Sequence, residues 1–301
     1  MMNKILYVIV SLFISMFVNA YVLTSERTVI IQDTVYMSGG VLLTTDDFKV
    51  NTDTAMFFRR DSIVIMPKKM KVTRKDSIEI NALRGTYFVK GKIFHLFNQE
   101  TVKKNSFTIE SESLEILLND SLFYYTKNPI LYFDKKQSSA EGDTIKYSFS
   151  TDSMKIFNKS IFKKKESYEA SSDTIYLMLD DSIYSFFHNC IVKTDSMNLE
   201  SDSMLMYGKD DYAQTFARTK IKNENIEMLS DTSKMYFRND SLDFLISYRN
   251  VDFISDDNNE IVRILCDSVE CDMEESKMKK TYFYQIKSSE METKEKDEAE
   301  K

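Results

Sequence analysis

The sequence predicts an all-β fold of roughly twenty short, mostly antiparallel strands with little helix. Apolar and polar residues alternate along many segments, turn signals recur every dozen or so residues, and the chain repeats itself with a period of about thirty residues. In the segment DSIEI, for example, Ile78 and Ile80 share one face of a strand and Glu79 lies on the other. Each predicted strand therefore has one apolar and one polar face.

Eight imperfect repeats follow one another along one long architecture without a linker. They begin at Asp53, Gly85, Glu112, Asp143, Asp173, Asp202, Asp231 and Asp267. Most begin with Asp followed by Ser or Thr, whose short side-chain oxygens accept hydrogen bonds from nearby backbone N-H groups in turns. We expect these pairs to mark the start of each strand. A catalytic serine is not expected, because the pair recurs along the chain and no histidine is close enough in sequence to act as its base.

The ends of the chain differ from the repeats in composition. Lys4, the apolar residues 5–18 and the small-residue pattern at 18–20 are typical of a signal peptide, so we expect cleavage after Ala20 and export to the periplasm. The alternative is an uncleaved membrane anchor, although the apolar run is shorter than the roughly 20 residues that span a bilayer. We expect residues 21–286 to form one repeated domain. Residues 287–301 are charged and lack aromatic side chains, which predicts a disordered tail.

Composition excludes several classes of function. A net charge of -7 at pH 7 argues against nucleic-acid binding, which needs a basic surface. Cys190, Cys266 and Cys271 are an odd number and are expected to fill the core, while His95 and His188 do not lie at metal-ligand spacing. We therefore expect no catalytic residue, no metal and no cofactor. The protein is expected to bind and not to catalyse.

The segments VYMSGGVLLTTDDFKVNTDTAMFFRRDSIVIM (35–66) and VTRKDSIEINALRGTYF (72–88) resemble the OstA-like repeat family. That family includes the periplasmic lipopolysaccharide-transport proteins LptA and LptC and the periplasmic domain of LptD. The resemblance covers residues 30–285 and implies an elongated β-jellyroll with a V-shaped section, whose apolar interior carries lipid A acyl chains across the periplasm. It also implies partners of the same transport system, joined through terminal strands. The chain departs from the family in keeping the strand-ending glycines mainly at Gly39-Gly40 and in having eight repeats.

The apolar face of the repeats supplies the candidate lipid-binding residues. They are Ile63, Ile65, Ile78, Ile80, Leu114, Ile116, Met154, Ile156, Ile175, Leu177, Met197, Leu199, Met204, Met206, Leu242 and Phe244. Each of these could equally belong to a closed core, because protein interiors pack densely. The seventeen methionines of the chain favour an adaptable lining, although methionine also fills gaps in ordinary cores.

Lipid A carries phosphates, and a dense basic stretch could bind them at the rim of an apolar trough. The candidates are Lys68, Lys69, Lys71, Arg74 and Lys75. The alternative is a solvated turn that protects a strand edge.

Two functions thus follow from the sequence. The first is a periplasmic lipid-binding bridge protein that carries lipopolysaccharide between the inner and outer membranes. The second is a structural or adhesive β-solenoid that binds protein partners without lipid. A filled, closed interior favours the second.

Overall fold

The computed structural model describes residues 21–74, 77–103, 106–164, 167–194, 197–238, 241–256, 260–274 and 277–293. These residues form 24 β-strands and one short 3-10 helix, η1 (Asp134–Lys136), and they contain no α-helix. The strand pairings among them are antiparallel throughout. The structure confirms the predicted all-β, antiparallel fold.

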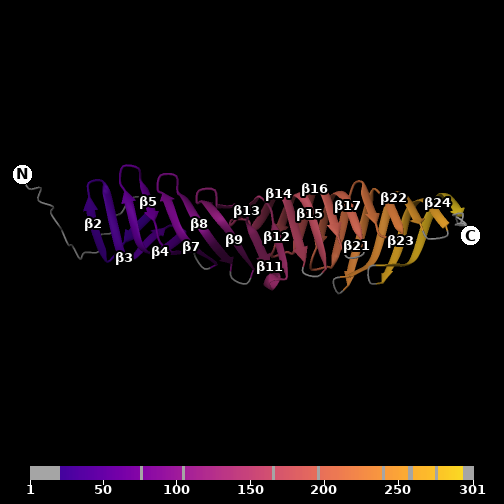
Figure 1. The fold of residues 1–301 in the computed structure, drawn as a ribbon, viewed down its shortest axis with the longest axis horizontal. Coiled ribbons are helices and arrows are strands. Elements are labelled where there is room, and N and C mark those ends of the chain that lie inside the picture. The colour runs from indigo at the N-terminus through magenta and orange to yellow at the C-terminus, as the bar shows by residue number, and fades with distance from the viewer. Residues whose placement is uncertain are drawn as a thin grey trace, which may run out of the picture. The chain divides into compact units, whose positions relative to one another are not determined.

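The chain divides into two compact units, which are described separately. Unit 1 contains the described residues up to Lys136 together with Asp143–Asp152, and unit 2 contains Gln137–Gly142 and the described residues from Ser153 onward. Within each unit, strands that are close in sequence lie side by side (Figure 1). The strands of unit 1 are β1 (Tyr21–Thr24), β2 (Arg27–Ile31), β3 (Thr34–Thr45), β4 (Phe48–Phe58), β5 (Ile63–Met66), β6 (Met70–Arg74), β7 (Ile78–Phe88), β8 (Ile93–Lys103), β9 (Phe107–Leu117), β10 (Leu122–Thr126), β11 (Ile130–Phe133) and β13 (Thr144–Ser148). Those of unit 2 are β12 (Ser138–Glu141), β14 (Ser153–Lys164), β15 (Tyr168–Met178), β16 (Ile183–Lys193), β17 (Asn198–Tyr207), β18 (Tyr212–Phe216), β19 (Thr219–Lys222), β20 (Ile226–Ser230), β21 (Thr232–Arg238), β22 (Ser241–Asp256), β23 (Glu260–Glu274) and β24 (Lys277–Thr293).

The long strands bend near their midpoints, so that their two halves pair with different partners. The first half of β4 pairs with β6 and its second half with β5. In the same way, the first half of β17 pairs with β19 and its second half with β18. Arm I of each unit consists of the short strands β5, β10 and β13 (unit 1) or β18 and β21 (unit 2) and of the half-strands in the same ladder. Arm II consists of β6 and β11 (unit 1) or β12, β19 and β20 (unit 2) and of the half-strands in that second ladder. In each unit the two arms meet at the bend, and their other ends are the free edges.

Pairs of consecutive residues with left-handed backbone mark many of the bends. These doublets are Gly39-Gly40, Lys127-Asn128, Asn158-Lys159, His188-Asn189, Ala217-Arg218 and Arg249-Asn250. The strand ladder shifts its register at several of them, for example between Phe157 and Ser160. There the two residues of the doublet oppose one residue of the partner strand, and this β-bulge bends the strand. From Lys127 onward the doublets begin 31, 30, 29 and 32 residues apart. This spacing agrees with the predicted period of about thirty residues.

A single left-handed residue ends each four-residue turn at the free edge of arm I. These turns are residues 59–62, 89–92, 118–121, 149–152, 179–182 and 208–211, and the last residue of each has a positive φ. At Ser62, Lys92, Ser121 and Ser182 the carbonyl of that residue accepts a hydrogen bond from the first residue of the following turn, as from Val89 N to Ser62 O at 3.0 Å. Hydrogen bonds of this kind extend the ladder of each unit into its turns.

The Asp-Ser and Asp-Thr pairs occupy two different places, so the prediction that they mark strand starts is only partly right. Asp61-Ser62, Asp120-Ser121 and Asp181-Ser182 lie in turns before strands, as predicted. Asp53-Thr54, Asp173-Thr174 and Asp202-Ser203 instead lie at the bends inside β4, β15 and β17. There the acidic side chain can bind a doublet of the next strand, as Asp173 Oδ2 accepts a hydrogen bond from Asn189 Nδ2 at 3.0 Å.

The structure corrects the predicted boundary of the C-terminal tail. Residues 287–293 belong to β24, where Ser289 pairs with Ile264 and Thr293 pairs with Glu260 of β23. Backbone hydrogen bonds to a neighbouring strand order this charged segment, although its composition suggested disorder. The predicted signal peptide, residues 1–20, and residues 294–301 lie outside the described residues.

Candidate ligand-binding interior

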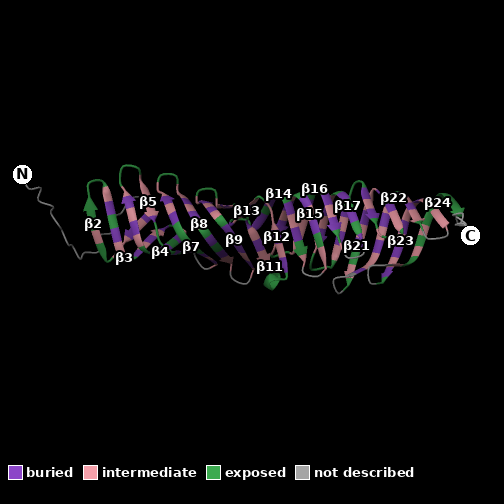
Figure 2. Cartoon of the chain, viewed as in Figure 1, coloured by how far each residue is buried: buried purple, intermediate pink, exposed green. Residues whose placement is uncertain are grey.

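Apolar side chains from both arms fill the space between them in each unit. Buried and exposed residues alternate along most strands, as Figure 2 shows, so one face of each arm points inward. Thirteen of the sixteen predicted lipid-binding residues are at most 6% exposed: Ile78, Ile80, Leu114, Ile116, Met154, Ile156, Ile175, Leu177, Met197, Leu199, Met204, Met206 and Leu242. The alternation in sequence therefore located the inward face at these positions.

Ile63, Ile65 and Phe244 are corrections to that set, because they are only half-buried. The strand β5 reads IVIM and is apolar on both faces, so alternation could not decide its orientation, and Val64 and Met66 point inward instead. In β22 the register against β21 shifts between Tyr236 and Phe237. This irregularity turns Phe244 away from the interior.

Aromatic rings dominate the interior of unit 1. Phe48 of arm II contacts Phe94 and Phe123 of arm I, with ring centroids 6.4 and 6.1 Å apart. Tyr87 stacks on Phe94 at 4.3 Å. Phe107 of arm II meets Tyr147 of arm I edge to face at 5.2 Å. Rigid rings that interdigitate in this way hold the two arms of unit 1 in contact.

Methionine is more frequent in the interior of unit 2. Seven methionines are buried there: Met154, Met197, Met204, Met206, Met228, Met235 and Met273. Unit 1 buries Met37, Met66 and Met70. Toward the free edges of unit 2, the hydroxyl of Tyr168 from arm II donates a hydrogen bond to the sulfur of Met206 from arm I at 2.9 Å. Because methionine is unbranched and flexible, this interior can repack more readily than that of unit 1.

Charged side chains join the free edges of the two arms in unit 1. The guanidinium carbon of Arg74, at the end of β6, lies 4.4 Å from the centroid of the Phe149 ring. Lys103, at the end of β8, forms an ion pair with Asp152, which also accepts a hydrogen bond from Tyr147 Oη at 2.7 Å. The side chain of Lys103 is only 16% exposed, so water screens this ion pair weakly. These contacts close the edge of unit 1.

Two buried tyrosines lie beside this edge. Burial raises the pKa of Tyr147, and the hydrogen bond to Asp152 raises it further, so Tyr147 stays protonated and donates to the carboxylate. Burial also raises the pKa of Tyr87 to about 12. Tyr87 lines a small cavity of about 50 Å³ together with Asp46 and Lys92, and its hydroxyl has no hydrogen-bond partner among the described residues.

The structure does not gather the described phosphate-binding candidates at one rim: Lys68, Lys69 and Lys71 lie near the bend and Arg74 at the free edge. Lys68 and Lys69 are exposed in the turn that connects β5 to β6 at the bend, as the alternative of a solvated turn predicts. Lys71 Nζ lies 2.6 Å from Glu79 Oε2 in an exposed ion pair across neighbouring strands. Arg74 lies at the free edge of its arm, and Lys75 is outside the described residues.

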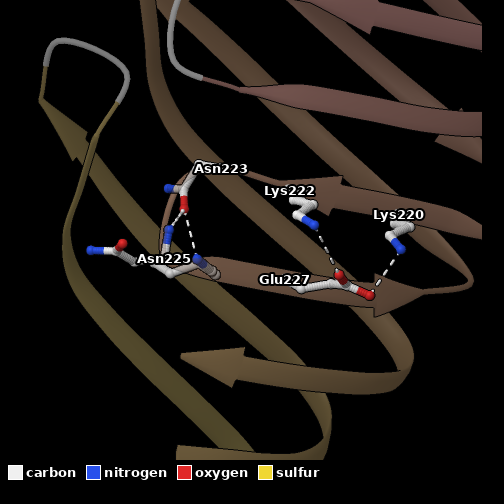
Figure 3. A network of polar contacts seen from close by, with 6 residues as sticks. Lys220, Lys222, Asn223, Asn225 and Glu227 are labelled. Atoms are coloured by element: carbon white, nitrogen blue, oxygen red, sulfur yellow. Dashed lines mark hydrogen bonds and ion pairs between the residues drawn. The ribbon is translucent and has the colours of Figure 1, made fainter. Parts of the chain in front are cut away.

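Unit 2 has a similar exposed polar network at the hairpin between β19 and β20 (Figure 3). Glu227 forms ion pairs with Lys220 at 2.9 Å and with Lys222 at 3.9 Å. The side-chain oxygen of Asn223 accepts hydrogen bonds from the backbone N-H groups of Asn225 and Ile226 at 3.0 and 2.8 Å. The carboxylate of Glu227 accounts for the raised pKa of Lys220. This network fixes the hairpin, because its polar groups bind one another.

Sequence reasoning missed a group of buried hydroxyls near the bend of unit 2. Ser233 Oγ lies 2.6 Å from Ser247 Oγ and 3.1 Å from Ser230 Oγ. Thr215 Oγ1 lies 2.7 Å from Thr219 Oγ1 and accepts a hydrogen bond from the backbone N-H of Ser233 at 2.9 Å. The available signal was Ser or Thr on both sides of an acidic residue, as in SDTS at 230–233. The interior of unit 2 thus combines a hydroxyl-lined bend with apolar arms.

The cysteines and the possible metal-ligating groups are the remaining candidates among the described residues. Cys190, Cys266 and Cys271 are buried free thiols, and burial raises the pKa of Cys190 and Cys271 to about 12. Within the described ranges, no group of three or more His, Cys, Asp or Glu side chains is arranged to hold a metal ion. The same part of the chain contains no helix that is long and apolar enough to cross a membrane.

Comparison with known proteins does not add to this geometry. No family model matches the chain, and no curated protein matches it. The repeats, the two arms and the interior between them are the features from which a function can be inferred.

Proposed function

We propose that this protein is a periplasmic lipid-binding protein that carries lipopolysaccharide, or a related glycolipid, with the acyl chains between the arms of unit 2. The observation that carries the proposal is the set of seven buried methionines in that interior. Flexible methionine side chains can move aside for an acyl chain, and each methylene that enters contributes about 0.8 kcal/mol. The proposed mechanism is binding and passage, without catalysis or a cofactor.

The terminal strands support a role in a bridge between the two membranes. In β2, Val29, Ile30 and Ile31 are 46, 50 and 57% exposed. In β24, Tyr282, Tyr284 and Ile286 are 45–54% exposed. Among the described strands, β2 pairs with β3 alone and β24 with β23 alone, so each keeps an edge that can accept another strand. In this proposal the partners are other proteins of the Lpt type, as the OstA-like resemblance implies.

A structural or adhesive protein without lipid is the second candidate. The observation that favours it is the complete burial of many interior side chains, including Ile175 and Leu177 of unit 2, which are 0% exposed. In this alternative the two arms stay packed together, and the exposed apolar residues of β2 and β24 bind protein partners.

Native mass spectrometry separates the two candidates. The full chain is purified from the periplasm of a lipopolysaccharide-producing host, and its mass is measured as isolated, after delipidation and after re-addition of lipopolysaccharide. Lipid transport predicts a stoichiometric glycolipid adduct that is lost and regained. A single apo mass that takes up no lipid contradicts the proposal and favours the structural protein.

A further inference from the structure

A groove of about 1070 Å³ crosses the strands of unit 1 beside the bend. Its lining includes exposed residues of β4, β7, β8 and β9, and it therefore runs across the strands and not along one of them. The side chains of these exposed residues point away from the aromatic interior, because they alternate with buried neighbours such as Thr52, Ala82 and Ser111. Those buried neighbours line the groove as well. The groove belongs to unit 1, whereas the lipid proposal refers to the interior of unit 2.

One polar side chain from each strand forms a row along the groove. The strand register places Asn51 opposite Lys71, Lys71 opposite Asn81, Asn81 opposite Glu100, and Glu100 opposite Glu110. Neighbouring strands lie about 4.8 Å apart, so the five residues span about 19 Å. Asp53, Leu83, Asn98, Glu112 and Asn128 line the groove on the side of the bend.

Two members of the row are in an unfavourable arrangement. Glu100 and Glu110 face each other directly across antiparallel strands, where like charges destabilise the pairing. Within the described part of the chain, neither carboxylate has an ion-pair or hydrogen-bond partner. A ligand that donates hydrogen bonds to both would relieve this repulsion.

The chemistry of the groove fits the hydroxyl groups of sugars. The amides of Asn51, Asn81 and Asn98 both donate and accept hydrogen bonds, and the carboxylates accept them, as vicinal hydroxyls require. Four carboxylates (Asp53, Glu100, Glu110, Glu112) against two lysines (Lys69, Lys71) leave the lining negatively charged, which disfavours anionic chains. An added peptide strand does not fit, because the backbone groups here already pair within the sheet.

We infer that this groove binds a linear, uncharged oligosaccharide that lies across the strands of unit 1. A β-linked pyranose chain advances by about the spacing of neighbouring strands per sugar. Successive sugars therefore meet Asn51, Lys71, Asn81 and Glu100 in turn. The inference does not depend on lipid binding in unit 2.

Titration calorimetry of the full chain with cellohexaose, a linear β-linked glucose hexamer, tests the inference. We expect a dissociation constant of roughly 0.1–1 mM. The double variant Asn81→Ala/Glu100→Ala should weaken binding about tenfold or more, because it removes several hydrogen bonds. Glu227→Ala, on the exposed hairpin of unit 2, is the matched surface control and should leave binding unchanged.

Two further measurements test the location of the sugar-binding site and its selectivity for an uncharged ligand. Glu100→Gln removes the like-charge pair and should raise the melting temperature of the sugar-free protein. A hexamer of galacturonic acid should bind at least about tenfold more weakly than cellohexaose, because its carboxylates meet those of the groove. Absence of cellohexaose binding up to about 10 mM overturns the inference. So does binding that the groove variant leaves unchanged, or equal affinity for the anionic hexamer.

Discussion

Lys103 and Asp152 join the two arms of unit 1 by an ion pair across their free edges. Lys103 ends β8 in arm II, and Asp152 is the left-handed residue that ends a turn of arm I. The two residues are 49 positions apart in sequence, so only the folded strands bring them together. Tyr147 binds the same carboxylate, which makes Asp152 the centre of the closed edge.

Lys103→Met should lower the free energy of unfolding by about 1–2 kcal/mol, because it removes the ion pair between Lys103 and the half-buried carboxylate of Asp152. Urea unfolding followed by circular dichroism measures this loss. Lys163→Met is the control, since Lys163 pairs with Glu141 while about half exposed, and its loss should be below about 0.5 kcal/mol. Equal losses in the two variants would show that the Lys103 pair is no stronger than a surface pair.

Asn250→Val should lower the free energy of unfolding by about 1–2 kcal/mol, because a β-branched residue resists the left-handed backbone at φ 52°. Asn250→Gly is the matched variant. It also loses the hydrogen bond to Asp231, but it fits the backbone and should stay within about 0.5 kcal/mol of the native protein. Thermal unfolding of both variants tests the role of the doublets, and a Gly variant as unstable as the Val variant argues against it.

Ile175→Asp and Ile116→Asp form a matched pair for the lipid proposal, because both residues are 0% exposed in arm I of their units. Ile116→Asp should unfold unit 1, since a charge cannot be accommodated among packed aromatic rings. Ile175→Asp should leave unit 2 folded but reduce lipid uptake, because the methionine-rich interior of that unit can rearrange. Circular dichroism and lipid loading are measured together. Unfolding of both variants to the same extent contradicts an adaptable interior in unit 2.

The buried thiols should be unreactive in the folded protein. Burial raises the pKa of Cys190 and Cys271 from 9 to about 12, so both stay protonated at neutral pH. A thiol reagent at pH 8 should label the native protein slowly and all three cysteines after unfolding in urea. Because the folded pKa is the higher one, the stabilisation from these groups is complete below pH 9 and is lost as the pH rises toward about 12. Rapid labelling of two or more thiols in the native state would contradict this prediction.

The alternation in sequence predicted the all-β fold and most of the inward face, because burial on one side of a strand imposes a period of two. The alternation did not predict the inward face where both faces of a strand are apolar or where the strand is irregular. Val64 rather than Ile65 points inward because every residue of β5 is apolar, and Phe244 changes face at an irregularity.

The bends were not predicted, although the sequence contains their signal. Glycine was expected to mark strand ends, but most doublets use other residues, and Asn occurs in four of them. Asparagine adopts the left-handed backbone at low cost because its short side chain binds the backbone or a neighbouring acid, as Asn250 binds Asp231. The contacts across the free edges, such as Arg74 with Phe149, could not be predicted because they depend on how the two arms meet.

Each segment of about thirty residues contains its own doublet and its own turn, so the chain can gain or lose whole segments. Duplication or deletion of one whole segment would add or remove two strands, or about 10 Å of sheet, and would leave the next segment with its inward face still inward. An insertion of one residue within a strand would instead reverse that face. Natural length variants of this protein should therefore differ by whole segments.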